Sequence, residues 1–144
     1  MHHKSLGPDF SVTSQLTPDA VAAAKAAGFG TIINNRPDRE EPGQPGSAEL
    51  EAKAKAAGMD YYHIPVVPGQ FGDAQIDAFG DAIAACSKPA LAFCKSGMRA
   101  ASLWALVQAG KLPPAEIMRR AATCGYDLAP LVPRIEARAK LIRS

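Results

Sequence analysis

The chain is poor in cysteine and lacks the cysteine spacings of common metal and redox sites. Its three cysteines, Cys86, Cys94 and Cys124, cannot all pair within one chain, and no two of them form a C-x-x-C motif. The pattern favours a reducing compartment. We therefore expect a cytoplasmic protein with no structural disulfide framework, no metal site and no cofactor.

Long apolar runs and clusters of basic residues are also missing. No apolar run approaches the length that spans a bilayer, and the amino terminus has no basic segment followed by an apolar stretch. The net charge is only +2, without a run of Lys or Arg and without aromatic residues placed between basic ones. These absences exclude membrane and nucleic acid from the expected partners.

The sequence does contain short apolar runs that alternate with helical patterns and are separated by Gly and Pro, which is typical of an α/β domain. With 144 residues and 47% apolar content, one domain is expected. We place it at residues 10–144 and interpret residues 1–9, including His2 and His3, as a tag or disordered start.

Strands are predicted at residues 10–16, 29–35, 59–67 and 89–94, with the first at an edge of the sheet. Helices are predicted to follow Thr17, Ser47 and Asp73, which serve as capping or opening residues. A buried helix follows the 89–94 run, and two more are expected at 114–124 and 131–142.

The stretch "FCKSGMRAASLWAL", residues 93–106, carries the clearest chemistry. Cys94 ends a buried strand, and Ser96 and Gly97 can turn the backbone so that its N–H groups form an anion-binding nest at the start of a helix. Arg99 returns to the same loop with a planar fork that can hold an oxyanion. Such a setting favours a nucleophilic thiolate, although a cysteine alone at this place would be an ordinary core residue.

Two further loops, "NNRPDREEPGQP" and "VVPGQFGD", are expected beside the Cys94 loop, because the carboxyl ends of parallel strands share one edge of a sheet. Asn34, Asn35 and Arg36 begin the first of them, where we expect them to brace the Cys94 loop, or alternatively to contact substrate. His63 is interpreted as a structural histidine and Cys124 as a packing residue, with a role as resolving thiol the lesser possibility.

The Cys94 loop, "INNRPDREEPGQP" and "YYHIPVVPGQ" together resemble the phosphatase-like domain family of the beta-lactamase hydrolase-like proteins, also called domain of unknown function 442. The resemblance runs from about Phe10 to Leu106. It implies a phosphotyrosine-phosphatase-like fold of the dual-specificity type, with a mostly parallel sheet of four or five strands and helices on both faces. It also implies sulfurtransferase activity for some members, and persulfide-handling partner enzymes.

The resemblance places the nucleophile at Cys94 and the oxyanion-binding arginine at Arg99. It places the anion-binding loop amides on four further residues: Lys95, Ser96, Gly97 and Met98. Lys95, Met98 and Ala100 depart from the residues that the family more often carries at these positions.

The sequence leaves the reaction open between sulfur transfer and phosphate-ester hydrolysis on a small anionic substrate. Only four residues separate Cys94 from Arg99, a loop size closer to rhodanese-type sulfurtransferases, and Ala100 lacks the hydroxyl that phosphatases tend to place after the arginine. These features favour sulfur transfer through a Cys94 persulfide over phosphate-ester hydrolysis through a Cys94 phosphoenzyme. A non-catalytic anion or redox sensor is a third interpretation.

Phosphate-ester hydrolysis would also need a general acid. No Asp occupies "HIPVVPGQ", so the candidates are Asp38 and Asp73 on the converging loops. Each also has an ordinary structural interpretation, Asp38 as a turn residue after Pro37 and Asp73 as a helix cap.

Overall fold

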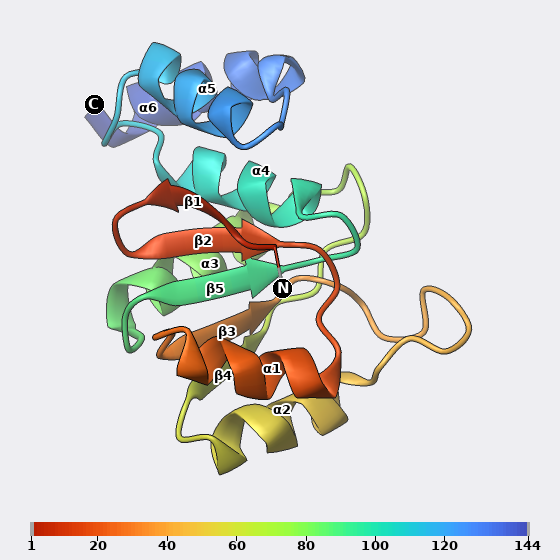
Figure 1. Ribbon diagram of the computed structural model, residues 1–144. Helices are drawn as coiled ribbons and strands as arrows, with labels where there is room; N and C mark the ends of the chain where they lie inside the picture. The colour runs from red at the N-terminus through yellow and green to blue at the C-terminus, as the bar shows by residue number, and fades with distance from the viewer. Residues whose placement is uncertain (1, 144) are drawn as a thin grey trace.

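The computed structural model describes residues 2–143, which fold around one five-stranded sheet (Figure 1). The strands are β1 (Lys4–Gly7), β2 (Phe10–Thr13), β3 (Thr31–Asn34), β4 (Asp60–His63) and β5 (Ala90–Phe93). They lie in the order β1-β2-β5-β3-β4. β1 is antiparallel to β2, and every other neighbouring pair is parallel. The predicted, mostly parallel sheet is confirmed.

Six α-helices and one short 3-10 helix complete the described fold. They are α1 (Pro18–Ala26), α2 (Ser47–Ala56), α3 (Asp73–Ala85), α4 (Met98–Val107), α5 (Pro114–Thr123), η1 (Ala129–Leu131) and α6 (Val132–Arg143). Thr17 caps α1 as predicted, because its Oγ1 accepts a hydrogen bond from the Ala20 N–H at 3.1 Å. Asp73 is instead the first residue of α3, after Gly72, and makes no cap hydrogen bond, so its predicted role as a cap is wrong.

Helices cover both faces of the sheet, as predicted. α1 and α2 lie on one face, while α3 and α4 lie on the other (Figure 1). The neighbouring residues Ile32 and Ile33 of β3 belong to separate apolar clusters, because successive side chains of a strand point to opposite faces. Leu50 packs in the cluster of Ile32, and Phe79 and Leu103 pack in that of Ile33. The central strands are therefore buried on both sides.

Part of the stretch predicted as a tag or disordered start forms a strand. Lys4–Gly7 forms β1, which pairs with β2 in register Lys4 to Val12 and Ser5 to Ser11. The interpretation of residues 1–9 as a disordered start is therefore wrong for this stretch, and so is the placement of the 10–16 strand at the sheet edge. Leu6 explains the difference, because it is 1% exposed and adds to the main apolar cluster.

The carboxyl ends of the parallel strands are aligned. Asn34 is paired with both Phe93 of β5 and His63 of β4, and Phe93 is also paired with Thr13 of β2. The loops that follow these residues consequently start from one row at one edge of the sheet, where open α/β sheets bind ligands. This edge holds the Cys94 loop and the two loops that the sequence predicted beside it.

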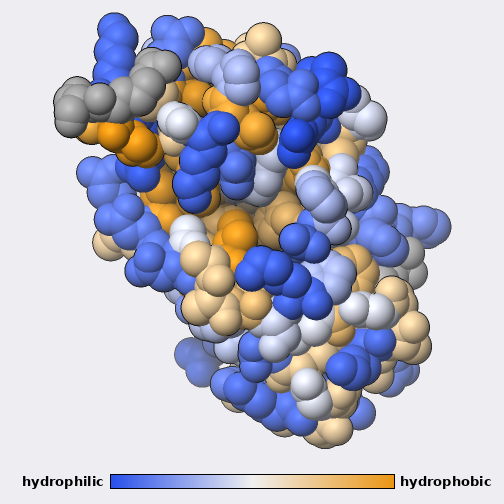
Figure 2. Space-filling view, turned by 90° about the vertical axis from the view of Figure 1, so that its left-hand side faces the viewer, coloured by the Kyte–Doolittle hydropathy of each residue, from blue (hydrophilic) through white to orange (hydrophobic). Residues whose placement is uncertain are grey.

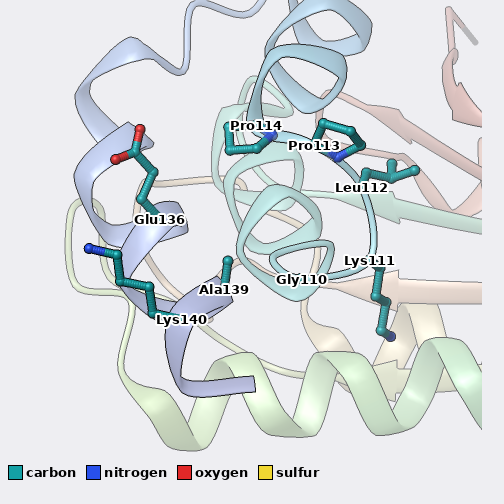
Figure 3. A pocket seen from close by; sticks show the side chains of 8 residues that line it. All are labelled: Gly110, Lys111, Leu112, Pro113, Pro114, Glu136, Ala139 and Lys140. Atoms are coloured by element: carbon teal, nitrogen blue, oxygen red, sulfur yellow. The ribbon is translucent and has the colours of Figure 1, made fainter. Parts of the chain in front are cut away.

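The opposite edge carries a separate cavity. α4 runs back from the Cys94 loop, and the turn after it meets α6 around a pocket of about 480 Å³ lined by Gly110, Lys111 and Glu136, among others (Figure 3). Figure 2 faces this side of the molecule and shows it hollowed. None of the lining residues belongs to the Cys94 loop. No helix within residues 2–143 is long and apolar enough to cross a membrane.

Candidate active site

Cys94 follows β5 directly and has no exposed surface. The backbone N–H of Gly97 donates a hydrogen bond to its Sγ, at 3.1 Å. α4 begins at Met98, so the positive end of its macrodipole lies beside the sulfur. The amide and the helix end both attract negative charge, which suits a bound oxyanion.

Gly97 is required by the shape of this loop. Its φ is +96°, a left-handed conformation that residues with a side chain rarely adopt, and a Cβ at this position would overlap the hydroxyl of Tyr126. That hydroxyl donates to the carbonyl of Ser96 at 3.3 Å. Tyr126, in the segment before η1, therefore contacts the Cys94 loop. No local sequence pattern predicts this contact.

Arg99 lies in the first turn of α4 and is 7% exposed. Its Nη1 donates to Glu40 Oε2 at 2.8 Å and to the Val66 carbonyl at 2.8 Å, and its Nη2 donates to Glu40 Oε1 at 2.9 Å. The loops after β3 and β4 together fix the guanidinium. The predicted convergence of these loops on the Cys94 loop is therefore observed.

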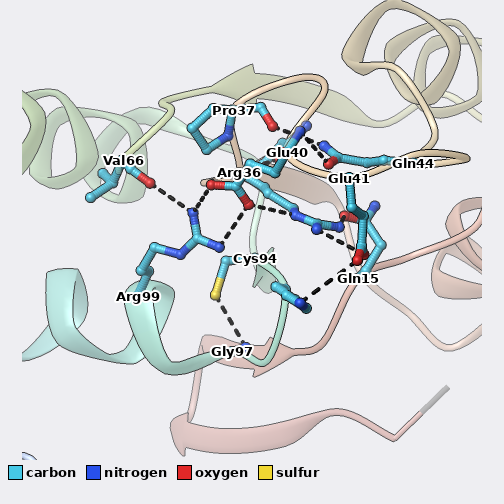
Figure 4. Close-up of polar contacts among 12 residues, drawn as sticks. Gln15, Arg36, Pro37, Glu40, Glu41, Gln44, Val66, Cys94, Gly97 and Arg99 are labelled. Carbon is cyan, nitrogen blue, oxygen red and sulfur yellow. Dashed lines mark hydrogen bonds and ion pairs between the residues drawn. The ribbon is translucent and has the colours of Figure 1, made fainter. Parts of the chain in front are cut away.

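These contacts leave one edge of the Arg99 guanidinium available. A guanidinium has five N–H groups, of which Glu40 and Val66 take both on Nη1 and one on Nη2. The Nε–H and the second Nη2–H have no hydrogen-bond partner among the described residues. In Figure 4 this edge faces the Sγ of Cys94. Two parallel donors of this kind match two oxygens of a phosphate or a similar oxyanion.

Glu40 is shared by two arginines. Its Oε1 also accepts from Nε of Arg36 at 2.7 Å, while Arg36 donates further to Glu41 at 2.9 Å and to Gln15 at 3.0 Å (Figure 4). The hydrogen bonds from Arg99, followed by those from Arg36, lower the pKa of Glu40 against the opposing effect of burial. Glu40 is therefore an ionised carboxylate that positions Arg99.

Arg36 contacts Gln15, which in turn contacts the Cys94 loop. The backbone N–H of Gln15 donates to the carbonyl of Lys95 at 3.2 Å, and its side chain accepts from Arg36. Arg36 itself is 1% exposed. Arg36 is thus linked to the Cys94 loop by way of Gln15, which the sequence did not single out, and its bracing role stays a prediction.

Asn34 and Asn35 hold the row of strand ends. Asn34 accepts from the backbone N–H of Arg36 at 2.9 Å and donates to the Tyr61 hydroxyl at 3.0 Å. Asn35 donates from its side chain to the Ile64 carbonyl at 2.9 Å, and its Oδ1 is buried without a hydrogen-bond partner. His63 contacts the Arg36 carbonyl through Nε2 at 2.9 Å, in line with a structural histidine.

The two aspartates proposed as general acids are engaged elsewhere. Asp38 Oδ1 accepts from the backbone N–H of Ser47 at 2.8 Å and so ties down the start of α2. Asp73 is exposed and pairs with Arg134 and Arg138 of α6 at 3.2 and 3.3 Å. Both carboxylates have structural partners.

The other loop residues named from the sequence, Lys95, Ser96 and Met98, are exposed to solvent. The Nζ of Lys95 is 3.7 Å from a carboxylate oxygen of Glu41, in an ion pair that solvent reaches. Ser96 Oγ accepts from the Met98 N–H at 3.4 Å, and Met98 is 39% exposed. Of the four loop amides, that of Gly97 is the one hydrogen-bonded to Cys94 within the described residues.

Sequence reasoning missed Glu40 and Gln15 as site residues. Glu40 stands in the loop already expected at this edge, so a buried arginine after Cys94 could have prompted a search for its carboxylate partner. Gln15 belonged to a stretch predicted as strand, although β2 ends at Thr13. Within residues 2–143, no three His, Cys, Asp or Glu side chains are grouped so as to hold a metal ion.

Comparison with known proteins agrees with this geometry. Residues 2–111 match the family of the phosphatase-like domain of beta-lactamase hydrolase-like proteins. The chain belongs to this family. A beta-lactamase hydrolase-like protein of Agrobacterium fabrum is 45% identical over 105 residues, which are 72% of this chain and 24% of that protein. The chain thus spans about a quarter of that relative's length, and the family resemblance read from the sequence is confirmed.

Solved structures extend the comparison to the fold of this phosphatase-like domain. A proposed phosphatase of Neisseria meningitidis matches with a TM-score of 0.83 and 31% identity, over 94% of this chain and 96% of that one. The core catalytic domain of a PP-IP phosphatase of S. cerevisiae matches with a TM-score of 0.67 over 93% and 83% of the two chains. At 14% identity the yeast match concerns the fold alone. The predicted phosphatase-like α/β fold is confirmed.

Proposed function

We propose that this domain hydrolyses small phosphate monoesters through a covalent intermediate on Cys94. The observation that carries the proposal is the edge of Arg99, formed by Nε and Nη2, that faces the Cys94 sulfur without a protein partner. A phosphoryl group bound there would present two oxygens to Arg99 and its phosphorus to the thiol. The phosphatase folds among the solved relatives favour the same reaction.

The reaction takes two steps. The Cys94 thiolate attacks phosphorus, the S–P bond forms, and the P–O bond to the leaving alcohol breaks while that oxygen takes up a proton. Water then attacks the phosphocysteine, the S–P bond breaks, and inorganic phosphate leaves. Because the thiol has no exposed surface in this arrangement, attack also requires the groups that bury it to move.

Electrostatic stabilisation in both steps falls to the loop and to Arg99. Charge on the equatorial oxygens increases during transfer, and donors that are already oriented toward them stabilise it without reorganisation. The N–H of Gly97 and the Arg99 edge serve as such donors, and the amides of Lys95, Ser96 and Met98 complete the loop. Glu40 acts as a positioning residue because it holds the guanidinium by its two terminal nitrogens, Nη1 and Nη2.

Sulfur transfer through a Cys94 persulfide is the second candidate function, and the short loop between Cys94 and Arg99 is the feature that favours it. It would require a sulfane-sulfur donor and an acceptor such as a persulfide-handling partner enzyme. The phosphatase-like folds of the solved relatives support hydrolysis, which we therefore propose first. A non-catalytic sensor would bind oxyanions at the same loop without turnover.

Mass spectrometry separates these functions. The intact protein is incubated with an activated aryl phosphate and, separately, with thiosulfate, and then quenched in acid. We expect release of inorganic phosphate from the aryl ester and a phosphoryl adduct that is absent from Cys94→Ser. A sulfur adduct on Cys94 with no phosphate release would support sulfur transfer instead, and binding without any adduct or turnover would support the sensor.

A further inference from the structure

A pocket of about 540 Å³ opens directly beside the Cys94 loop. Its lining combines loop and helix-start residues, among them Lys95, Met98 and Arg99, with residues of the segments 68–71 and 127–134. Arg99, whose free edge faces the Cys94 sulfur, is therefore also part of the lining of this pocket. The chemistry of the pocket walls then restricts the substrate.

The lining is mainly apolar. The apolar lining residues are Pro68, Phe71, Met98, Leu128, Pro130 and Leu131. Transfer of apolar surface from water into such a lining is favourable, at about fourfold in affinity for each buried methylene group. The leaving group that fits this pocket is an apolar alcohol or phenol rather than a sugar or a polyol.

One carboxylate, that of Asp127, belongs to the lining. Its Oδ1 accepts from the Ala129 N–H at 3.0 Å, which fixes the side chain at the start of η1, and the other oxygen has no hydrogen-bond partner among the described residues. The neighbours on both sides are anchored, because Tyr126 bonds to Ser96 of the Cys94 loop and Leu128 is 2% exposed. Asp127 is thus an exposed carboxyl group, held through one oxygen, in the same lining as Arg99.

We propose that this pocket binds the apolar leaving group of the substrate and that Asp127 is the general acid for it. This inference rests on the proposed phosphatase function. In the first step, the Asp127 carboxyl gives its proton to the leaving oxygen as the P–O bond breaks. In the second step, the resulting carboxylate takes a proton from the water that attacks phosphorus, so that the acid is restored when phosphate leaves.

The other carboxyl groups near the site are less suited to this role. Glu40 is held ionised between Arg99 and Arg36, so it has no proton to give. Asp38 is bonded to the start of α2, and Asp73 lies in a salt bridge with α6. Neither Asp38 nor Asp73 lines the pocket.

The test compares four proteins, and two further variants as rival acids, on three substrates. The proteins are the wild type, Cys94→Ser, Asp127→Asn and the control Asp19→Asn, whose carboxylate lies on the exposed first turn of α1. The substrates are p-nitrophenyl phosphate, whose leaving group needs no protonation, n-hexyl phosphate and glycerol phosphate. Asp38→Asn and Asp73→Asn are measured on the same substrates as rival acids.

We expect Asp127→Asn to lower kcat on hexyl phosphate roughly a hundredfold and kcat on p-nitrophenyl phosphate by less than about threefold. Asp19→Asn, Asp38→Asn and Asp73→Asn should follow the wild type in that ratio. In the wild type, kcat/KM should be at least about tenfold higher for hexyl than for glycerol phosphate, even if only part of the hexyl chain is buried.

The identity of the acid, the character of the leaving group and the phosphatase function can each be overturned by a different result. Cys94-dependent hydrolysis with equal losses on both leaving groups, or a selective loss in Asp38→Asn or Asp73→Asn, would remove Asp127 as the acid and leave the phosphatase function standing. A preference for glycerol phosphate would overturn the apolar character of the leaving group. No Cys94-dependent hydrolysis of any ester would overturn the proposed function and this inference together.

Discussion

The two oxygens of the Glu40 carboxylate are bound by the two terminal nitrogens of Arg99, at 2.8 and 2.9 Å. This paired contact sets the plane of the guanidinium and leaves the Nε and Nη2 edge for a ligand. Arg36, almost fully buried, holds Glu40 from its other side at 2.7 Å. The arginine of the site is thus oriented before any substrate arrives.

Glu40→Gln should lower kcat/KM for an aryl phosphate by about tenfold to a hundredfold, the range typical of residues that orient a catalytic group. The amide keeps the size of Glu40 but replaces one acceptor oxygen with a donor that faces the guanidinium. Steady-state kinetics and the binding of inorganic phosphate as an inhibitor measure the effect. Glu41→Gln serves as the control, because Glu41 contacts Arg36 and Lys95 but not Arg99, and less than a threefold loss is expected. Equal losses in the two variants would show that net charge matters rather than orientation.

The same carboxylate predicts how stability depends on pH. Arg99 and then Arg36 lower the pKa of Glu40 below its ordinary value of 4.5, so the folded state binds a proton less readily than the unfolded one. The resulting stabilisation is present above pH 4.5 and is lost as pH falls through the lowered pKa of the folded protein. Denaturant unfolding across this range should show the wild type more stable than Glu40→Gln at neutral pH, with the difference closing in acid. A stability difference between the two proteins that stays constant down to pH 3 would contradict this pH dependence.

The sequence predicted those parts of the molecule that depend on local pattern. The strand ending at Cys94, the turn at Gly97 and the helix carrying Arg99 lie within one short stretch, so spacing alone placed them correctly. The buried central strands followed from continuous apolar runs, with β5 entirely buried.

Contacts between distant segments could not be predicted in this way. Glu40 meets Arg99 across 59 positions of sequence, and Tyr126 meets Ser96 across 30, so neither pairing has a local pattern. The strand at Lys4–Gly7 escaped prediction because its burial rests largely on Leu6. Asp38 and Asp73 were plausible acids by position, but unlike Asp127 neither of them lines the pocket beside the Cys94 loop.

Tyr61→Phe should lower the free energy of unfolding of the protein by about 1–2 kcal/mol. The Tyr61 hydroxyl lies 2.8 Å from Ser47 Oγ and accepts from Asn34 at 3.0 Å, and its loss leaves buried polar groups without a partner. Burial raises the pKa of Tyr61, so the hydroxyl stays neutral and hydrogen-bonded through the whole physiological range. Chemical denaturation measures the free energy of unfolding. Tyr62→Phe on the same strand, at a half-buried position, is the matched control with less than about 0.5 kcal/mol expected.

Gly97→Ala tests whether the shape of the Cys94 loop depends on the contact with Tyr126. Both the φ of +96° and the overlap of the new Cβ with the Tyr126 hydroxyl oppose the substitution. The backbone effect alone costs about 1–2 kcal/mol, and the overlap adds to it. We therefore expect a larger loss of unfolding free energy than for Gly28→Ala, where φ is +103° and no atom lies within 4 Å of the added Cβ.

A double variant separates the two contributions to the Gly97→Ala effect. Tyr126→Phe removes the hydroxyl that the alanine Cβ would overlap, together with its bond to Ser96. If the overlap matters, Gly97→Ala should cost less in the Tyr126→Phe background than in the wild type, by about 1 kcal/mol or more. Hydrolysis of the aryl phosphate should recover in parallel, because the backbone N–H of residue 97 would again reach Cys94. Additive losses would mean that the left-handed backbone alone makes glycine necessary, and that Tyr126 does not set the shape of the loop.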